Sequence, residues 1–164
     1  MTDFKRLLHA LADNGVEFIL VGGLAAAAHG SIRNTQDVDI VYRRTAENIQ
    51  RLVAALQPLS PYLRGAPPGL PFKWDARSIE RGLNFTLSTT AGAIDTLGEI
   101  TGGGDYDRLL PYTVRLEVLG IQCLCINLER LIHVKRAAGR PKDFEAVAEL
   151  ELLRDAAPPN PSKE

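Results

Sequence analysis

The chain has 164 residues, and its 19 Lys and Arg residues nearly balance its 20 Asp and Glu residues. This length can bury one sizeable core, so we expect a single domain. The balanced charge excludes a polybasic nucleic-acid binder, and any contact with RNA would have to come from a local patch. No apolar run is long enough to span a membrane, and the first residues lack a signal-peptide pattern. We therefore expect a cytoplasmic protein without membrane contacts.

The first part of the chain alternates between helical and strand patterns. Apolar residues at helical spacing predict a helix over residues 2–14. An apolar run predicts a strand over 16–21, and a segment of small residues predicts a short helix over 23–30. A second apolar run predicts a strand over 37–42, and a further helix is expected over 46–57.

The second part begins with a Pro- and Gly-rich stretch at 58–71, which we expect to be a loop, and loops of this length inside compact domains are often functional. The pattern as a whole predicts an α/β (α+β) domain over 1–155, with a small mixed sheet flanked by helices. The elements predicted after the loop are strands at 83–89 and 93–98, a helical turn at 106–110, a hairpin of 113–118 with 121–126, and helices from 128 to about 138 and from 142 to 153. Residues 156–164 are expected to form a disordered tail.

Residues 18–40 carry most of the functional information. An apolar strand enters the Gly22-Gly23 turn, a helix of small residues follows, and the next strand presents Asp37 and Asp39. Side chains at i and i+2 of a strand point to the same face, so the two carboxylates project together. Adjacent carboxylates repel unless a cation lies between them, and oxygen ligands suit Mg²⁺. The glycine turn brings bare backbone N–H groups close by, which suits a phosphate chain. Together these features indicate nucleotide chemistry.

This segment resembles the polymerase-beta-like nucleotidyltransferase superfamily. The pattern Val-Gly-Gly-x-Ala, then His-Gly, then Arg-x-Thr-x-Asp-x-Asp-Ile is similar to small bacterial proteins related to abortive-infection (AbiEii-type) nucleotidyltransferase toxins. With the later elements, the resemblance extends from about residue 4 to residue 153. It implies transfer of an NMP from an NTP to an acceptor hydroxyl, with two Mg²⁺ ions held by Asp37 and Asp39. Through toxin–antitoxin systems, it also implies RNA, such as a tRNA 3′ end, as one acceptor.

A third acid is needed to complete a site with two metal ions, because the attacking hydroxyl and the leaving oxygen must both be stabilised. Asp95 is an acid between apolar residues of a predicted strand, which is how the superfamily presents its third carboxylate. The structural alternative is a strand-end aspartate that takes part in a turn. Glu99 is a weaker candidate on the same side of the strand. We expect Asp95 to join Asp37 and Asp39 as a metal ligand and catalytic residue.

Several other residues are candidates for contacts with the nucleotide. Gly22 and Gly23 would let the backbone approach a phosphate, since a Cβ would block it. Arg33 could pair with a triphosphate or, equally well, form a salt bridge to one of the two aspartates. Thr35 could order the loop before the strand or bind a phosphate oxygen.

A basic segment near the C-terminus, Lys-Arg-Ala-Ala-Gly-Arg-Pro-Lys-Asp over 135–143, resembles the Lys-x-x-x-x-x-Arg-x-Lys-Asp segment of the same toxin-related family. A basic cluster that faces an acidic metal site would neutralise part of a triphosphate. The alternative is a set of solvated helix ends, where cations are favoured by the helix dipole. We expect Lys135 and Lys142 to contact the nucleotide, and Asp143 to cap its helix or to orient a basic neighbour.

Other functions remain open from the sequence. A small-molecule enzyme of the antibiotic-modifying type would form its acceptor pocket with residues 58–75, and a protein-modifying enzyme would attach the nucleotide to a partner side chain. A binding module would keep the fold without turnover. The acceptor site could also depend on a partner protein or a homodimer. Tyr62, Phe72 and Trp74 near the Pro-rich loop could stack on a base or fix the loop to the core.

Overall fold

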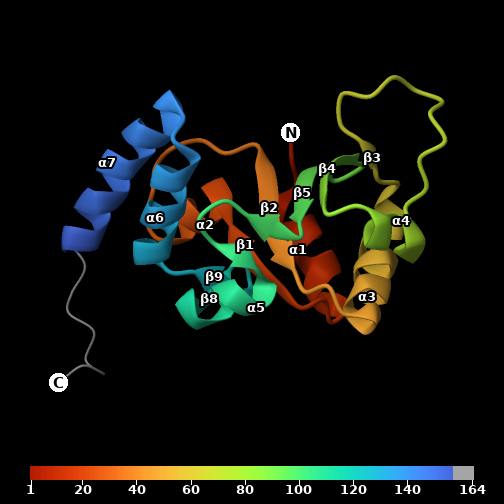
Figure 1. Ribbon diagram of the computed structural model, residues 1–164, viewed down its shortest axis with the longest axis horizontal. Coiled ribbons are helices and arrows are strands. Elements are labelled where there is room, and N and C mark those ends of the chain that lie inside the picture. The colour runs from red at the N-terminus through yellow and green to blue at the C-terminus, as the bar shows by residue number, and fades with distance from the viewer. Residues whose placement is uncertain (157–164) are drawn as a thin grey trace.

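The computed structural model describes residues 1–156, and it shows one large mixed sheet, one small sheet and seven helices within them (Figure 1). The strands of the large sheet are β1 (Phe18–Val21), β2 (Asp37–Tyr42), β3 (Tyr62–Leu63), β4 (Asn84–Thr89), β5 (Gly92–Leu97), β8 (Thr113–Val118) and β9 (Ile121–Ile126). The small sheet pairs β6 (Glu99–Ile100) with β7 (Gly104–Asp105). The helices are α1 (Phe4–Asp13), α2 (Gly22–Ala28), α3 (Ala46–Leu56), α4 (Ala76–Arg81), α5 (Tyr106–Leu109), α6 (Leu128–Ala138) and α7 (Pro141–Ala156), with 3₁₀ turns at Gln57–Leu59 and Leu110–Tyr112.

The large sheet has the strand order β3-β4-β5-β2-β1-β9-β8. Its central strand β2 pairs antiparallel with β1 and parallel with β5, and β1 pairs parallel with β9. The parallel pairing of β2 with β5 places Asp39 opposite Asp95. The topology therefore brings the two acidic segments of the chain, more than fifty residues apart in sequence, to neighbouring strands in the middle of the sheet.

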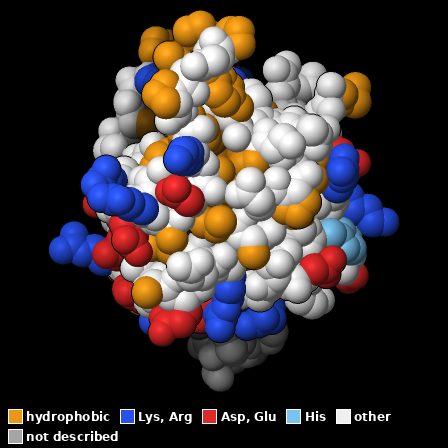
Figure 2. Space-filling view, turned by 90° about the vertical axis from the view of Figure 1, so that its right-hand side faces the viewer, with side chains coloured by type: hydrophobic (Ala, Val, Ile, Leu, Met, Phe, Trp, Pro, Cys, Tyr) orange, Lys and Arg blue, Asp and Glu red, His pale blue; other side chains and the backbone are white. Residues whose placement is uncertain are grey.

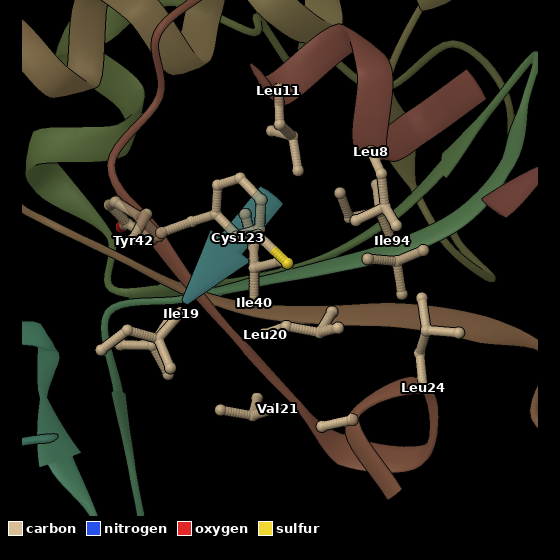
Figure 3. Packing of buried hydrophobic residues seen from close by; sticks show 14 of the residues in the cluster. Leu8, Leu11, Ile19, Leu20, Val21, Leu24, Ile40, Tyr42, Ile94 and Cys123 are labelled. Carbon is tan, nitrogen blue, oxygen red and sulfur yellow. The ribbon is translucent and has the colours of Figure 1, made fainter. Parts of the chain in front are cut away.

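One face of the sheet is covered by α1, which packs against α3. Leu8 and Leu11 point from α1 onto a buried layer that includes Ile40 and Ile94 (Figure 3). Because side chains alternate along a strand, the packing of Ile40 on this face puts its neighbour Asp39 on the opposite face. Burial of the apolar face thus fixes the direction in which the acids project.

The described residues confirm the predicted α/β class, the mixed sheet and its flanking helices. The bounds predicted for β2, β8 and β9 are those of the structure, and no helix within residues 1–156 is long and apolar enough to cross a membrane. Ala156, which we placed in the tail, lies in α7. The rest of the expected tail lies outside the described residues.

The segment predicted as a loop at 58–71 contains the short strand β3, which was missed, and α4 just after it was missed as well. Neither element is long enough to produce a recognisable period, because β3 has two residues and α4 has six. The Pro-rich chain between them protrudes beside α4 (Figure 1), and hydrophobic side chains gather at that end of the molecule in Figure 2. Leu70 in this segment is exposed.

Candidate active site

Three carboxylates converge where β2 and β5 run side by side. Asp37 and Asp39 come from β2 and Asp95 comes from β5, and one oxygen of each lies within 4.8 Å of the others. Asp95 lies within its strand, which continues to Leu97, rather than in a strand-end turn. Glu99 lies in β6 outside this cluster. The structure thus brings together the three acids that the sequence singled out.

The raised pKa values of two carboxyl groups in this cluster indicate that it would bind a cation. Burial raises the pKa of Asp39 to about 8, and a hydrogen bond shared with Asp95 and the nearby charges of Asp37 and Asp95 act in the same direction. The positive charge of Lys135 acts against them. Burial and the charge of Asp95 also raise the pKa of Asp37. The charged forms of Asp37 and Asp39 are therefore disfavoured in the absence of a cation, and the oxygen-only donor set of the cluster fits Mg²⁺.

Arg64 reaches this cluster from the edge of the sheet, a contact that the sequence analysis missed. Its Nη2 donates a hydrogen bond to Asp95 Oδ1 at 2.9 Å, and its Nη1 lies 3.7 Å from Asp37 Oδ2. The residue follows β3, in the segment that was expected to be a loop. No signal in the sequence distinguished this arginine, because its position depends on the pairing of β3 with β4.

Gly22 and Gly23 lie directly beside the acids at the start of α2. Gly22 has a φ of +70°, and a Cβ at this position would overlap the Asp39 carboxylate. A Cβ on Gly23 would lie 2.6 Å from the Thr35 hydroxyl. Thr35 in turn donates a hydrogen bond to the Asp37 carbonyl oxygen at 3.3 Å. Glycine is therefore required for the close approach of α2, the 31–36 loop and the acidic strand.

The basic residues Lys135 and Arg140 line the same hollow as the acids. Lys135 lies 3.6 Å from the buried Asp143, and Arg140 Nε donates a hydrogen bond to that carboxylate at 2.7 Å. Asp143 therefore orients two basic neighbours, and Arg140 lowers its pKa. Arg33 pairs with Glu145 at 3.6 Å, not with either aspartate that we had considered as its partner.

The acids and the basic residues, including Arg33 and Lys142, line one cavity of about 770 Å³. This volume is typical of pockets that hold ligands of nucleotide size. A second hollow of about 650 Å³ adjoins it beside β6 and β7. The wall between the two hollows is formed by residues that line both, namely Asn84, Glu99, Ile100 and Thr101.

The aromatic residues near the Pro-rich segment fix it to the domain. The rings of Tyr62 and Phe72 meet edge to face at 6.1 Å. Trp74 is buried against Phe85, and its Nε1 donates a hydrogen bond to the Val53 carbonyl oxygen at 3.3 Å. Of the two interpretations left open by the sequence, the structure shows the packing role.

The chain aligns over most of its length with solved structures of nucleotidyltransferases. The lincosamide antibiotic adenylyltransferase LnuA, bound to lincomycin, aligns with a TM-score of 0.61 at 14% identity, over 93% of this chain and 98% of its own. ANT(2'')-Ia in complex with adenylyl-2''-tobramycin aligns with a TM-score of 0.56 at 16% identity, over 92% of both chains. The chain has the nucleotidyltransferase fold.

A candidate nucleotidyltransferase from Thermotoga maritima has the same nucleotidyltransferase fold, with a TM-score of 0.53 at 18% identity over 94% of both chains. No family model and no curated protein matches the sequence. These likenesses show the fold that the resemblance of the motif led us to expect. They do not show the closer relation to abortive-infection toxins.

Proposed function

We propose that this protein is a Mg²⁺-dependent nucleotidyltransferase that moves an NMP from an NTP to an acceptor hydroxyl. The observation that carries the proposal is the convergence of Asp37, Asp39 and Asp95 beside the Gly22-Gly23 turn, within the nucleotidyltransferase fold. Two Mg²⁺ ions held by these carboxylates would neutralise phosphate charge and stabilise the attacking and leaving oxygens.

The reaction is a displacement at the α-phosphorus. The acceptor oxygen forms a bond to this atom, while the bond to the oxygen that bridges to the β-phosphorus breaks and its electron pair leaves with pyrophosphate. Asp95 takes the proton of the acceptor hydroxyl and passes it to water. We place the phosphates against the backbone at Gly22 and Gly23, where Lys135, which lines the same cavity, would neutralise part of their charge.

We propose a small hydroxylated molecule as the acceptor. The second hollow supports this proposal, because it opens beside the acid-bearing cavity and is formed by this chain alone. The bound compounds of the LnuA and ANT(2'')-Ia structures, lincomycin and adenylyl-2''-tobramycin, are small molecules as well. The net charge of −1 gives an RNA acceptor no comparable support.

Labelled nucleotide identifies the acceptor class. Purified protein is incubated with each α-³²P-labelled NTP, Mg²⁺ and a cell extract divided into small-molecule, RNA and protein fractions. We expect label in the small-molecule fraction, and none with the Asp37→Ala/Asp39→Ala double variant. Label in RNA or in protein would overturn the proposed acceptor while keeping the reaction. Nucleotide binding without transfer to any fraction would contradict the function itself and favour a binding module.

A further inference from the structure

Arg64 lies outside the acidic cluster and contacts two of its three carboxylates. Its guanidinium lies between the carboxylates of Asp95 and Asp37, and its Nη2 also donates a hydrogen bond to the Leu87 carbonyl oxygen at 2.7 Å. One nitrogen thus joins the third acid to the backbone of β4. This geometry ties the orientation of the Asp95 carboxylate to the edge of the sheet.

The backbone holds Arg64 in register with the acid. Its N–H donates to the Thr86 carbonyl oxygen at 2.9 Å, and Thr86 is the β4 residue opposite Asp95. The side chain is only 30% exposed, and its buried Nε has no hydrogen-bond partner among residues 1–156. A buried donor without a partner is unfavourable, so the contacts of the two terminal nitrogens must hold this conformation.

Asp95 is consequently held by Arg64, which binds one of its oxygens from the β3 side. Asp39 lies opposite Asp95 on the β2 side. A carboxylate fixed in this way presents a defined oxygen to an incoming hydroxyl. The positive charge of Arg64, however, also repels any divalent ion that the three acids bind.

We propose that Arg64 is a positioning residue that orients Asp95 for the acceptor hydroxyl and does so at the expense of metal affinity. The kinetic part of this inference rests on the proposed function. The orientation of Asp95 depends on the planar guanidinium of Arg64, which contacts Asp95 and the Leu87 carbonyl oxygen together. The effect on metal affinity depends only on the positive charge of Arg64.

Two substitutions separate these effects. Arg64→Met removes both the charge and the fork, so we expect Mn²⁺ to bind the free protein about tenfold more tightly while kcat falls by about 10- to 100-fold. Arg64→Lys keeps the charge and loses the fork, so Mn²⁺ binding stays near that of the wild type while kcat falls similarly. The KM for the NTP stays within about twofold in both, because the phosphate-facing residues are unchanged.

The measurements are Mn²⁺ binding by electron paramagnetic resonance, steady-state kinetics and a thermal melt of each variant, with Arg77→Met on the exposed side of α4 as the control. Unchanged or weaker Mn²⁺ binding by Arg64→Met, or full kcat in Arg64→Lys, would overturn the inference. A wild-type protein without transfer activity would instead refute the proposed function. The Mn²⁺ measurement still decides the role of Arg64 in that case.

Discussion

Asp39 lies directly opposite Asp95 in the parallel pairing of β2 with β5. Two acids in this relationship face one another across neighbouring strands, and burial together with the shared hydrogen bond raises the pKa of Asp39 to about 8. The metal-free site therefore holds a proton near neutral pH, and a divalent cation would replace it.

Asp39→Asn should abolish transfer and yet stabilise the metal-free protein. The amide removes a charge that the buried site disfavours, so we expect the free energy of unfolding near pH 8 to rise by about 1–3 kcal/mol. Thermal melts in a chelator measure this change. Glu117→Gln, at an exposed position of β8, is the control. A less stable Asp39→Asn protein would contradict the prediction, because it would mean that the folded protein favours the negative charge of Asp39.

The stability of the metal-free protein should depend on pH through Asp39. Its folded pKa of about 8 lies above the unfolded value of about 3.9, so the folded state binds more protons between these limits. The stabilising contribution is complete below pH 4 and is lost as the pH rises towards 8. The gap in melting temperature between Asp39→Asn and the wild type should therefore widen from pH 5 to pH 8. A constant gap would refute the raised pKa.

Gly22→Ala should destabilise the protein and inactivate it, because the new Cβ would overlap the Asp39 carboxylate. Gly69 also has a positive φ, of +91°, but nothing lies within 4 Å of a Cβ built there. Gly69→Ala thus reports backbone strain alone. Chemical denaturation should show Gly22→Ala less stable than Gly69→Ala by about 2 kcal/mol or more. Equal losses in the two variants would mean that the close approach of α2 to β2 is not needed.

Lys135→Met should weaken nucleotide binding more than it slows transfer. Lys135 lines the same cavity as the glycine turn, and Asp143 orients its ammonium group. Removing one charge from a phosphate-facing wall should raise the KM for the NTP about tenfold, or about 1.4 kcal/mol. Steady-state kinetics measure KM and kcat for Lys135→Met, with Lys5→Met at an exposed position as the control. A change in kcat at constant KM would place Lys135 at the reacting centre instead.

The acidic strand could be predicted because its signals are local. The alternation of Asp37 and Asp39 with apolar neighbours, and the glycine turn before them, set the bounds of β2 and the direction of its carboxylates. Asp95 was recognised by the same apolar surroundings. Each of these features depends on residues a few positions apart, which is the range over which sequence patterns carry structural information.

Arg64 could not be predicted because its role arises from pairing between strands. It reaches Asp95 only because β3 pairs with β4 and β4 pairs with β5. Similarly, the pairing of Arg33 with Glu145 needed the position of α7, which no local pattern specifies. Contacts of this kind depend on tertiary register, so a charged residue in a Pro-rich segment looks like any other in the sequence.

The most direct test of the central claim is the stoichiometry of the reaction. Purified protein is mixed with each NTP, Mg²⁺ and a panel of small hydroxylated acceptors, and pyrophosphate and the NMP adduct are quantified together. We expect equal amounts of both products from the wild type, and at least a hundredfold less from Asp95→Asn, which should still bind the nucleotide. Release of inorganic phosphate without an adduct, or full activity in Asp95→Asn, would contradict it.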